Sequence, residues 1–264
     1  MSASPVIQSV ADFYNHLAVS DACRLEKRLY KKQFYEYGQL NATDKKAFVE
    51  DIAHIEWRYT LKPATINIPR FEDEHREYLE IAILQVTLNQ GKRHKRIADI
   101  MQKAVPYPLL IVMAWAHDGG ESLALNAADK RINRADSNKI VVETVYDTGW
   151  LNLARLAPWQ QAFLADFQLT QFPFSNILAF YQAITQRIVA LNCAQHTGRY
   201  AVAAATNGGS TNRLAALRQL DQLQQERGEL RNKLSKEKNL GTQVQLNTRV
   251  KQLSDRIEAT KQTL

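Results

Sequence analysis

The chain has 264 residues, a formal net charge of +7, 45% hydrophobic residues and 23% charged residues. This composition is typical of a folded globular protein, and the length exceeds one typical domain but falls short of two full ones. No apolar run approaches the roughly 18 residues of a membrane-spanning helix. The amino terminus has no basic segment before its apolar residues, so a secretory signal is not expected. The positive charge permits a nucleic-acid partner without requiring one.

Residue types that usually mark cofactor and metal sites lack their characteristic spacing in this chain. The two cysteines, Cys23 and Cys193, lie far apart, and we expect both to remain thiols in a reducing cytoplasm. The six histidines form no HExxH motif, so a zinc site is not expected. Glycine-rich phosphate-binding motifs and a G-x-S-x-G motif are also absent. We therefore expect no cofactor, no nucleotide hydrolysis and no serine hydrolase chemistry.

The amino-terminal third predicts two helices followed by strands. Residues 5–18 and 43–53 place apolar side chains at helical spacing. HIEWRYTL, at 54–61, alternates apolar and polar residues, as a half-buried strand does. ATINI, at 64–68, lies between two prolines and predicts a second, short strand. EYLEIAILQVTL, at 77–88, is mostly apolar and predicts a central strand that is buried on both faces.

The middle of the chain continues the same α/β pattern. Residues 92–105 have an apolar face at helical spacing, and two prolines follow them. LLIVMAWA, at 109–116, predicts a buried strand, and HDGGE provides a turn to a strand at 122–131. A last strand is predicted at 139–150. Together these elements predict one α/β domain over 1–151, with a mixed sheet and flanking helices.

The remainder predicts helices only. Residues 152–205 form a helical segment that we expect to pack on the sheet, and 206–264 form a small-residue linker and a helical hairpin. Two heptad patterns are separated by Asn239-Leu240-Gly241, which predicts an antiparallel coiled-coil hairpin. Its apolar seam consists of Leu220, Leu223, Leu230, Leu234, Leu246, Val250, Leu253 and Ile257. The seam packs on its own domain, on a second copy or on a partner protein.

Several stretches together resemble one protein family. They are KKQFYEYG, IEWRYTLKPATINI, EYLEIAIL, VPYPLLIV and the tail KEKNLGTQVQLNTRVKQL. In this order and spacing they resemble the bacterial family known as domain of unknown function 4391. The resemblance implies that such proteins accompany helicases and DNA methyltransferases in bacterial defence islands. It brings no established catalytic residues.

One candidate site is that of a metal-dependent nuclease. A helix, a three-strand meander, a second helix and a further strand is the core order of restriction-endonuclease-like folds. In that fold, an acid on the second strand and an acid-x-lysine pair on the third bind a divalent metal. The central strand supplies Glu77 and Glu80, but lysine follows neither at the required spacing, and Asn67 stands where an aspartate is expected. In the nuclease alternative, Lys62 would stand in for the missing lysine from a neighbouring strand. We favour a degenerate core without a metal site, with an active nuclease as the alternative.

Two clusters of cations are candidates for nucleic-acid contacts. Cations at the start of a helix oppose its dipole, so a bound phosphate would explain the first cluster better than helix stability does. The second cluster is interleaved with aromatic residues that are able to stack on bases. The cations are Lys92, Arg93, Lys95 and Arg96 in the first cluster, and Lys27, Arg28, Lys31 and Lys32 in the second. The alternatives are a solvated charge run and an amphipathic helix.

Together with what the family resemblance implies, these observations predict a non-catalytic accessory subunit of a bacterial DNA-targeting anti-phage defence or restriction-modification system. We expect it to act in the cytoplasm and to bind DNA. Its expected protein partner is a helicase, a methyltransferase or a second copy of the chain. The alternatives are a metal-dependent nuclease and a structural adaptor that does not contact nucleic acid.

Overall fold

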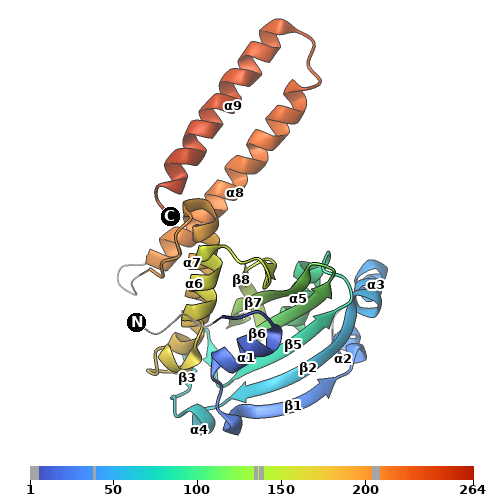
Figure 1. The fold of residues 1–264 in the computed structure, drawn as a ribbon, viewed down its shortest axis with the longest axis vertical. Coiled ribbons are helices and arrows are strands. Elements are labelled where there is room, and N and C mark those ends of the chain that lie inside the picture. Colours follow the sequence, from blue (N-terminus) through green and yellow to red (C-terminus); the bar gives the residue numbers. More distant parts are fainter. Residues whose placement is uncertain (1–5, 38–39, 134–135, 137–139, 204–208) are drawn as a thin grey trace. The chain divides into compact units, whose positions relative to one another are not determined.

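The computed structural model describes residues 6–264 apart from 38–39, 134–135, 137–139 and 204–208, and it describes only the backbone of 35–37. The chain divides into two compact units, 1–188 and 189–264. The first contains the sheet and the second contains the helical hairpin (Figure 1).

A seven-stranded mixed sheet forms the centre of the first unit. The strand order is β1-β2-β5-β6-β7-β8, and β9 pairs with β7. The strands are β1 (Arg24–Leu29), β2 (Ile52–Leu61), β5 (Ile81–Leu88), β6 (Leu109–His117), β7 (Gly120–Ile132), β8 (Ile140–Asp147) and β9 (Leu151–Asn152). Strands β5 and β6 pair in parallel, whereas the other pairs in this sheet are antiparallel. Because parallel neighbours need a crossover, α5 connects β5 to β6.

The helices flank this sheet or form the hairpin. They are α1 (Val10–Leu17), α2 (Lys31–Tyr37), α3 (Ala42–Asp51), α4 (Pro63–Ile66), α5 (His94–Ala104), α6 (Pro158–Asp166), α7 (Ile177–Thr197), α8 (Gly209–Leu234) and α9 (Leu240–Lys261). Two short 3₁₀ turns are η1 (Asp21–Cys23) and η2 (Leu169–Gln171). Strands β3 (Phe71–Glu72) and β4 (Glu77–Tyr78) form a separate two-stranded sheet. Within the described residues, no helix combines the length and the apolar character needed to cross a bilayer.

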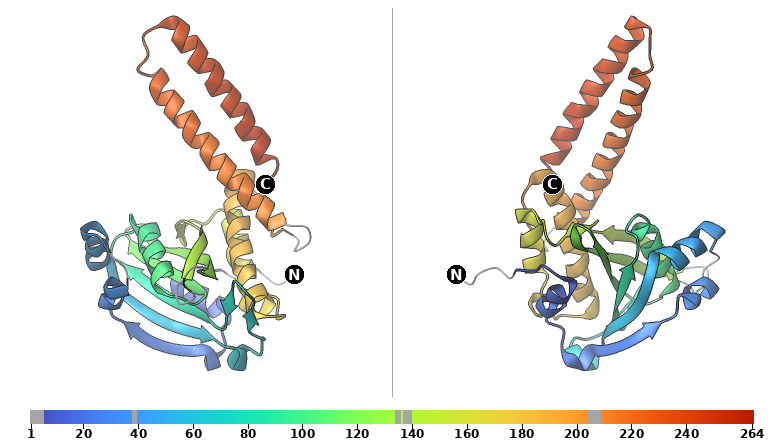
Figure 2. Two further views of the ribbon diagram at one scale, coloured as in Figure 1. Left: turned by 180° about the vertical axis from the view of Figure 1, so that it is seen from behind. Right: turned by 45° about the vertical axis from the view of Figure 1, so that its right-hand side comes forward.

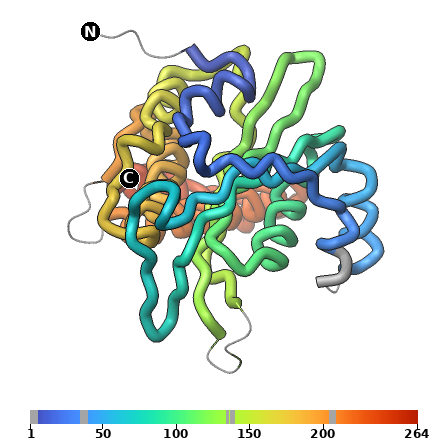
Figure 3. Tube along the Cα trace, turned by 90° about the horizontal axis from the view of Figure 1, so that it is seen from below, coloured from blue at the N-terminus to red at the C-terminus, as the bar shows by residue number. Residues whose placement is uncertain are grey.

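Helices α2, α3 and α5 cover one face of the sheet with apolar side chains. Phe34 of α2, Phe48 of α3 and Ile97 of α5 are buried in one cluster with Leu84 and Val86 of β5. Helix α5 contributes because its apolar residues recur at helical spacing along one side. Figure 3 shows α5 and α1 on opposite sides of the strands. This cluster forms the core on that face of the sheet.

The opposite face is covered only in part. Tyr181 of α7 lies against β6 and β7, because its hydroxyl donates to the carbonyl of Leu109 at 2.9 Å and accepts from the backbone N–H of Ala128 at 3.0 Å. Phe13 and Leu17 of α1 are fully buried. On β2 and β5, several side chains on this face are polar. The sheet therefore has an apolar face and a face that is partly polar.

The predicted mixed α/β sheet with flanking helices is confirmed, but two strand predictions are wrong. Residues 64–68 do not form a strand, because Pro63 begins the single turn of α4 and Asn67 ends it in the left-handed region at φ 53°. The central strand enters the large sheet only at Ile81, whereas Glu77 and Tyr78 belong to β4. Residues 24–29, which contain Lys27 and Arg28 of the second cation cluster, form a strand that was not predicted, β1.

The corrected strands keep only part of the order expected for a restriction-endonuclease-like core, because α2 and α3 are inserted between β1 and β2, and the β3-β4 sheet lies between β2 and β5. Strands β1, β2 and β5 form the antiparallel meander, α5 follows it, and β6 lies parallel to β5. The second and third strands of the meander are therefore β2 and β5. In a fold of this order, metal-binding or phosphate-binding side chains would lie on these two strands.

The second unit confirms the predicted helical hairpin. Helices α8 and α9 pack together along their length (Figures 1 and 2). The side chain of Asn239 caps α9 by accepting a hydrogen bond from the backbone N–H of Thr242 at 3.1 Å. The predicted linker lies partly outside the described residues, and Gly209 is the first residue of α8.

Candidate nucleic-acid interface

A row of polar side chains lies on the open face of β2 and β5. Its members, here called the polar row, are His54, Glu56 and Arg58 of β2 and Gln85 and Thr87 of β5. Glu56 is the cross-strand partner of Gln85. The intervening apolar residues, Ile55, Leu84 and Val86, turn to the other face and enter the core. The alternation of both strands thus places these polar groups on one surface.

Hydrogen bonds connect the polar row from strand to strand. Arg58 donates through Nη1 to Oε1 of Gln85 at 2.9 Å, and Nε2 of Gln85 donates to Oγ1 of Thr87 at 3.4 Å. The hydroxyl of Thr87 lies 3.2 Å from Nε2 of His54. Glu56 lies 4.0 Å from the Arg58 guanidinium. The row holds the Arg58 guanidinium, a single carboxylate and the side chains of His54, Gln85 and Thr87.

The polar row occupies the strands on which a nuclease of this topology would carry its metal ligands. A metal site there needs an acid on β2 and an acid-x-lysine pair on β5. Strand β2 has Glu56, but β5 has Gln85-x-Thr87, and the Arg58 guanidinium lies between the two strands. Among the described residues, no three His, Cys, Asp or Glu side chains gather as metal ligands would.

The predicted alternative catalytic residues lie at the end of these strands. Lys62 and Glu80 form an ion pair at 3.8 Å, just beyond the paired ends of β2 and β5. Glu77 is exposed on β4, in the separate small sheet. Lys62 and Glu80 are thus brought together, whereas Glu77 belongs to another sheet and the polar row consists of other residues.

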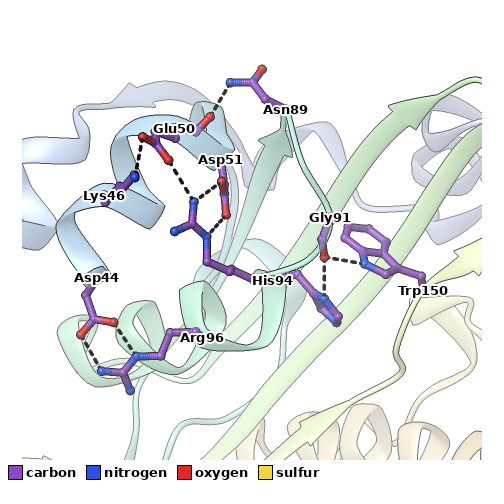
Figure 4. A network of polar contacts seen from close by, with 10 residues as sticks. Asp44, Lys46, Glu50, Asp51, Asn89, Gly91, His94, Arg96 and Trp150 are labelled. Carbon is purple, nitrogen blue, oxygen red and sulfur yellow. Dashed lines mark hydrogen bonds and ion pairs between the residues drawn. The ribbon is translucent and has the colours of Figure 1, made fainter. Parts of the chain in front are cut away.

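Two of the four cations at the start of α5 are bound by carboxylates of this chain (Figure 4). Arg93 donates from Nε and Nη2 to the two oxygens of Asp51, each at 2.6 Å. Arg96 donates in the same way to Asp44 at 2.8 and 2.6 Å. These hydrogen bonds hold the pKa of Asp44 below its usual value and raise the pKa of both arginines. Arg93 and Arg96, which were predicted to bind phosphate, are therefore bound by carboxylates of α3 instead.

Lys92 and Lys95 remain available at the surface. Both are exposed, and the Lys95 ammonium lies 4.0 Å from Asp147. The same Asp147 carboxylate lies 3.5 Å from Nε2 of the buried His94. Burial would raise the pKa of Asp147, but hydrogen bonds from His94, Asn126 and the backbone of Gly149 lower it overall. The helix start thus offers two solvated lysines beside a carboxylate that is already engaged.

The second predicted cluster divides over several environments. Arg28 is the cross-strand partner of Glu56, and it lines a shallow pocket together with Glu26 and His54. Lys27, the residue before Arg28 on β1, is the cross-strand partner of Trp57. Adjacent strand residues point to opposite faces, so these two cations do not form one patch.

The two lysines of α2, Lys31 and Lys32, also lie in different environments. Lys31 donates to the backbone carbonyls of Ile52 and, at 3.1 Å, of Val49, and burial lowers its pKa. Lys32 is exposed. Of the four cations in this cluster, Arg28 therefore lies beside the polar row, and Lys31 serves to cap the end of α3.

Most of the predicted partner-binding seam is buried within the hairpin. Leu220, Leu223, Leu230, Leu253 and Ile257 are buried in one cluster, and Leu246 and Val250 pack against it while partly exposed. Leu234 is half-buried. The seam therefore joins α8 to α9. Exposed apolar residues lie instead at the start of α9, where Leu240 is 78% and Val244 is 65% exposed.

The sequence contained the signal for the polar row, but not its pairing. The alternation over 54–61 marks the polar side of β2, and Gln85 and Thr87 are the uncharged polar residues of the central strand. The false strand at 64–68 concealed that these two segments are neighbours in the sheet. Tyr14 of α1 also lies at this surface, with its ring centre 4.3 Å from the Arg58 guanidinium. Sequence could not have placed it there, because η1, β1, α2 and α3 separate α1 from β2 along the chain.

Comparison with known proteins identifies the family. None of the curated proteins and none of the solved structures matches the chain. The family described as Domain of unknown function (DUF4391) matches residues 17–257, which confirms the resemblance and covers both structural units. The chain therefore belongs to the DUF4391 family.

Proposed function

We propose that this chain is a non-catalytic accessory subunit of a bacterial DNA-targeting defence or restriction-modification system. It binds nucleic acid in the cytoplasm and docks with a helicase or a methyltransferase. The observation that carries the proposal is the Arg58 guanidinium on β2, bonded to Gln85 of β5. This cation lies between the strands on which a nuclease of the same topology would hold a metal.

The chemistry of the polar row favours an anionic ligand. Divalent metals are bound by carboxylates, and the only carboxylate of the row, Glu56, already lies 4.0 Å from Arg58. An arginine in this position instead suits a phosphate oxygen, which accepts charge-assisted hydrogen bonds from the guanidinium. A nuclease-like core that has exchanged metal ligands for a cation would hold a strand without cleaving it.

The surrounding charges support the same role. Lys92, Lys95, Arg28 and Lys32 are exposed on the first unit, and the chain has a net charge of +7. Exposed lysines and arginines supply the sequence-independent part of nucleic-acid affinity. The association with helicases and methyltransferases rests on the family resemblance, and the exposed tip of the hairpin offers one apolar docking surface.

A binding assay combined with a cleavage assay tests the proposal. Fluorescence anisotropy on labelled single- and double-stranded DNA should show salt-dependent binding by the full chain. Incubation of the same DNA with Mg²⁺ or Mn²⁺ should give no cleavage. Cleavage that disappears in Glu56→Gln, or in Glu80→Gln, would establish the nuclease alternative.

The partner is tested separately. Co-purification from the native host should recover a helicase or a methyltransferase with the full chain. Recovery of that partner without any DNA binding by the complex would support a structural adaptor instead. Absence of both DNA binding and such a partner would contradict the proposed function.

A further inference from the structure

A pocket lies beside the polar row, between α1 and the strands. It has a volume of about 500 Å³ and is lined by Tyr14 and Asn15 of α1, Arg24 of β1, Arg58 and Tyr59 of β2, and Gln85 of β5, with apolar residues of α1 and the following turn. The charged residues among those that line this α1 pocket are the two arginines. The pocket is therefore cationic, and its volume lies within the range of small-molecule sites.

The two arginines differ in how far their charge is neutralised. Arg24 is about half exposed and pairs with Asp21 at 2.9 Å and with Glu26 at 3.0 Å. Arg58 is 25% exposed, donates to the neutral Gln85, and has Glu56 at 4.0 Å. Arg58 thus has one carboxylate contact, at 4.0 Å, whereas Arg24 has two shorter ones, so less of the Arg58 charge is neutralised within the chain and an anion would stabilise it.

Buried polar atoms without partners are found in the same wall. The Nε atom of Arg58 and the hydroxyl of Tyr14 are both buried and have no hydrogen-bond partner among the described residues. The Arg58 guanidinium lies 4.3 Å from the centre of the Tyr14 ring, which holds the cation in place. Buried donors of this kind are rarely left unsatisfied in folded proteins. Both donors lie below the pocket surface, and Arg58 reaches the pocket through the 25% of its side chain that is exposed.

Neutral groups complete the wall. The side-chain amides of Asn15 and Gln85 supply both donors and acceptors, and Tyr14 and Tyr59 supply aromatic rings. Amides suit the hydrogen-bonding edge of a base or the hydroxyls of a sugar. The two tyrosine rings are buried, with Arg58 over Tyr14, and belong to the floor of the pocket. The same pocket thus offers a cation for phosphate and neutral groups for the nucleoside attached to it.

We propose that the α1 pocket binds the phosphate group of a nucleotide, with Arg58 as its principal cation. The ligand is a phosphomonoester, either a free nucleoside monophosphate or the phosphorylated end of a strand. This inference rests on the proposed function and specifies the ligand of the same surface. Arg58 contacts the phosphate, and Asn15 and Gln85 contact the nucleoside.

Calorimetric titration of the full chain tests the ligand. The probes are the four deoxynucleoside 5′-monophosphates, the corresponding nucleosides and inorganic phosphate. Two oligothymidines, one with a 5′-phosphate and one with a 5′-hydroxyl, distinguish a strand end from a free nucleotide. We expect at least one monophosphate to bind more tightly than its nucleoside. If the strand end is the ligand, the phosphorylated oligothymidine also binds more tightly than the hydroxyl form.

Two variants test the residues. Arg58→Gln should weaken monophosphate binding by at least about tenfold, because it removes charge-assisted hydrogen bonds. The control Arg70→Gln, at a side chain that is 68% exposed outside the pocket, should leave binding unchanged. Asn15→Asp places a carboxylate in the pocket at an exposed position of α1 and should also weaken binding. Its control is Asn232→Asp on the hairpin.

Asn15→Asp keeps the test decisive if Arg58→Gln does not fold. Monophosphate binding that is unchanged in Asn15→Asp and in any folded Arg58→Gln protein would overturn the proposal, as would the absence of binding to every phosphate probe. DNA binding that persists without monophosphate binding would leave the proposed function standing and remove this pocket from it. Monophosphate binding without DNA binding would leave the pocket proposal standing and contradict the proposed DNA-binding function.

Discussion

Arg93 donates two hydrogen bonds of 2.6 Å to the carboxylate of Asp51, which is fully buried at the end of α3. Arg96, one turn later, makes the equivalent pair with Asp44 near the start of the same helix. The basic start of α5 is thus joined to α3 at two points (Figure 4). This arrangement offsets the unfavourable position of cations at a helix start, because the acids of α3 lie beside them.

Arg93→Gln should lower the urea midpoint of the first unit, because it leaves the buried Asp51 carboxylate without its charged partner. Lys92→Gln is the matched control at an exposed neighbour and should change stability by less than about 0.5 kcal/mol. Urea denaturation followed by circular dichroism measures both. Equal midpoints for the two variants would show that the Arg93 pair does not stabilise the fold.

The DNA contacts of this helix start are expected from Lys92 and Lys95 rather than from the two arginines. Reversal of both lysines to glutamate should weaken DNA binding and make the logarithmic salt dependence shallower by roughly 0.7–0.9 for each lost contact. The control reverses Lys233 and Lys251 on the hairpin, which changes the net charge equally. Anisotropy titrations at several salt concentrations give the slopes. An effect of equal size in both proteins would mean that only net charge matters.

Sequence patterns predicted the layers of this fold better than its site. Long apolar runs such as 109–116 identify strands because burial on both faces dominates their composition. Strand β1 was not predicted, since all but one of its residues are exposed at the sheet edge and carry no apolar alternation. The polar row was not predicted for a related reason. Pairing Glu56 with Gln85 requires the register of two strands that are distant in sequence, and no local pattern encodes that register.

Gly91 is required by its close approach to Trp115. A Cβ atom at this position would lie 2.5 Å from the Trp115 ring, and the Gly91 carbonyl accepts hydrogen bonds from Trp150 and from Nδ1 of His94. Gly91→Ala should therefore cost about 1–3 kcal/mol. Gly228→Ala, in open space within α8, should instead stabilise its helix by about 1 kcal/mol. Melting temperatures that move in the same direction for both variants would contradict this explanation.

Lys130 should make stability depend on pH. Its ammonium is buried, donates to the carbonyls of Val105 and Tyr107 at 2.7 and 2.8 Å, and has its pKa lowered by burial to about 7. Above pH 7 the folded state loses this proton while the unfolded state keeps it, so stability rises with pH, by at most about 1.4 kcal/mol per unit. Below pH 7 both states are protonated and the contribution is constant.

Denaturation between pH 6 and pH 9 measures this dependence. Lys130→Met should lose the part of the rise that lies above pH 7, although it also leaves two carbonyls without a donor. Lys103→Met, at a side chain that is 60% exposed, should keep the slope of the unsubstituted protein. If Lys130→Met and the unsubstituted protein give parallel curves, Lys130 does not release its proton in this range.

The hairpin should be stabilised by its own seam rather than by a partner. Leu230 is 7% exposed and packs between α8 and α9, so Leu230→Ala should cost about 2–5 kcal/mol in the second unit, depending on how far the seam closes around the cavity. Leu240→Ala removes the same atoms at a residue that is 78% exposed and should leave stability unchanged.

Hydrogen exchange of the α8 and α9 amides reports the loss locally, because opening of the hairpin exposes these amides whether or not the first unit unfolds. A wild-type exchange pattern in Leu230→Ala would mean that the seam does not hold the two helices together. If Leu240→Ala instead weakens self-association or partner binding with unchanged exchange, the exposed start of α9 is the docking surface.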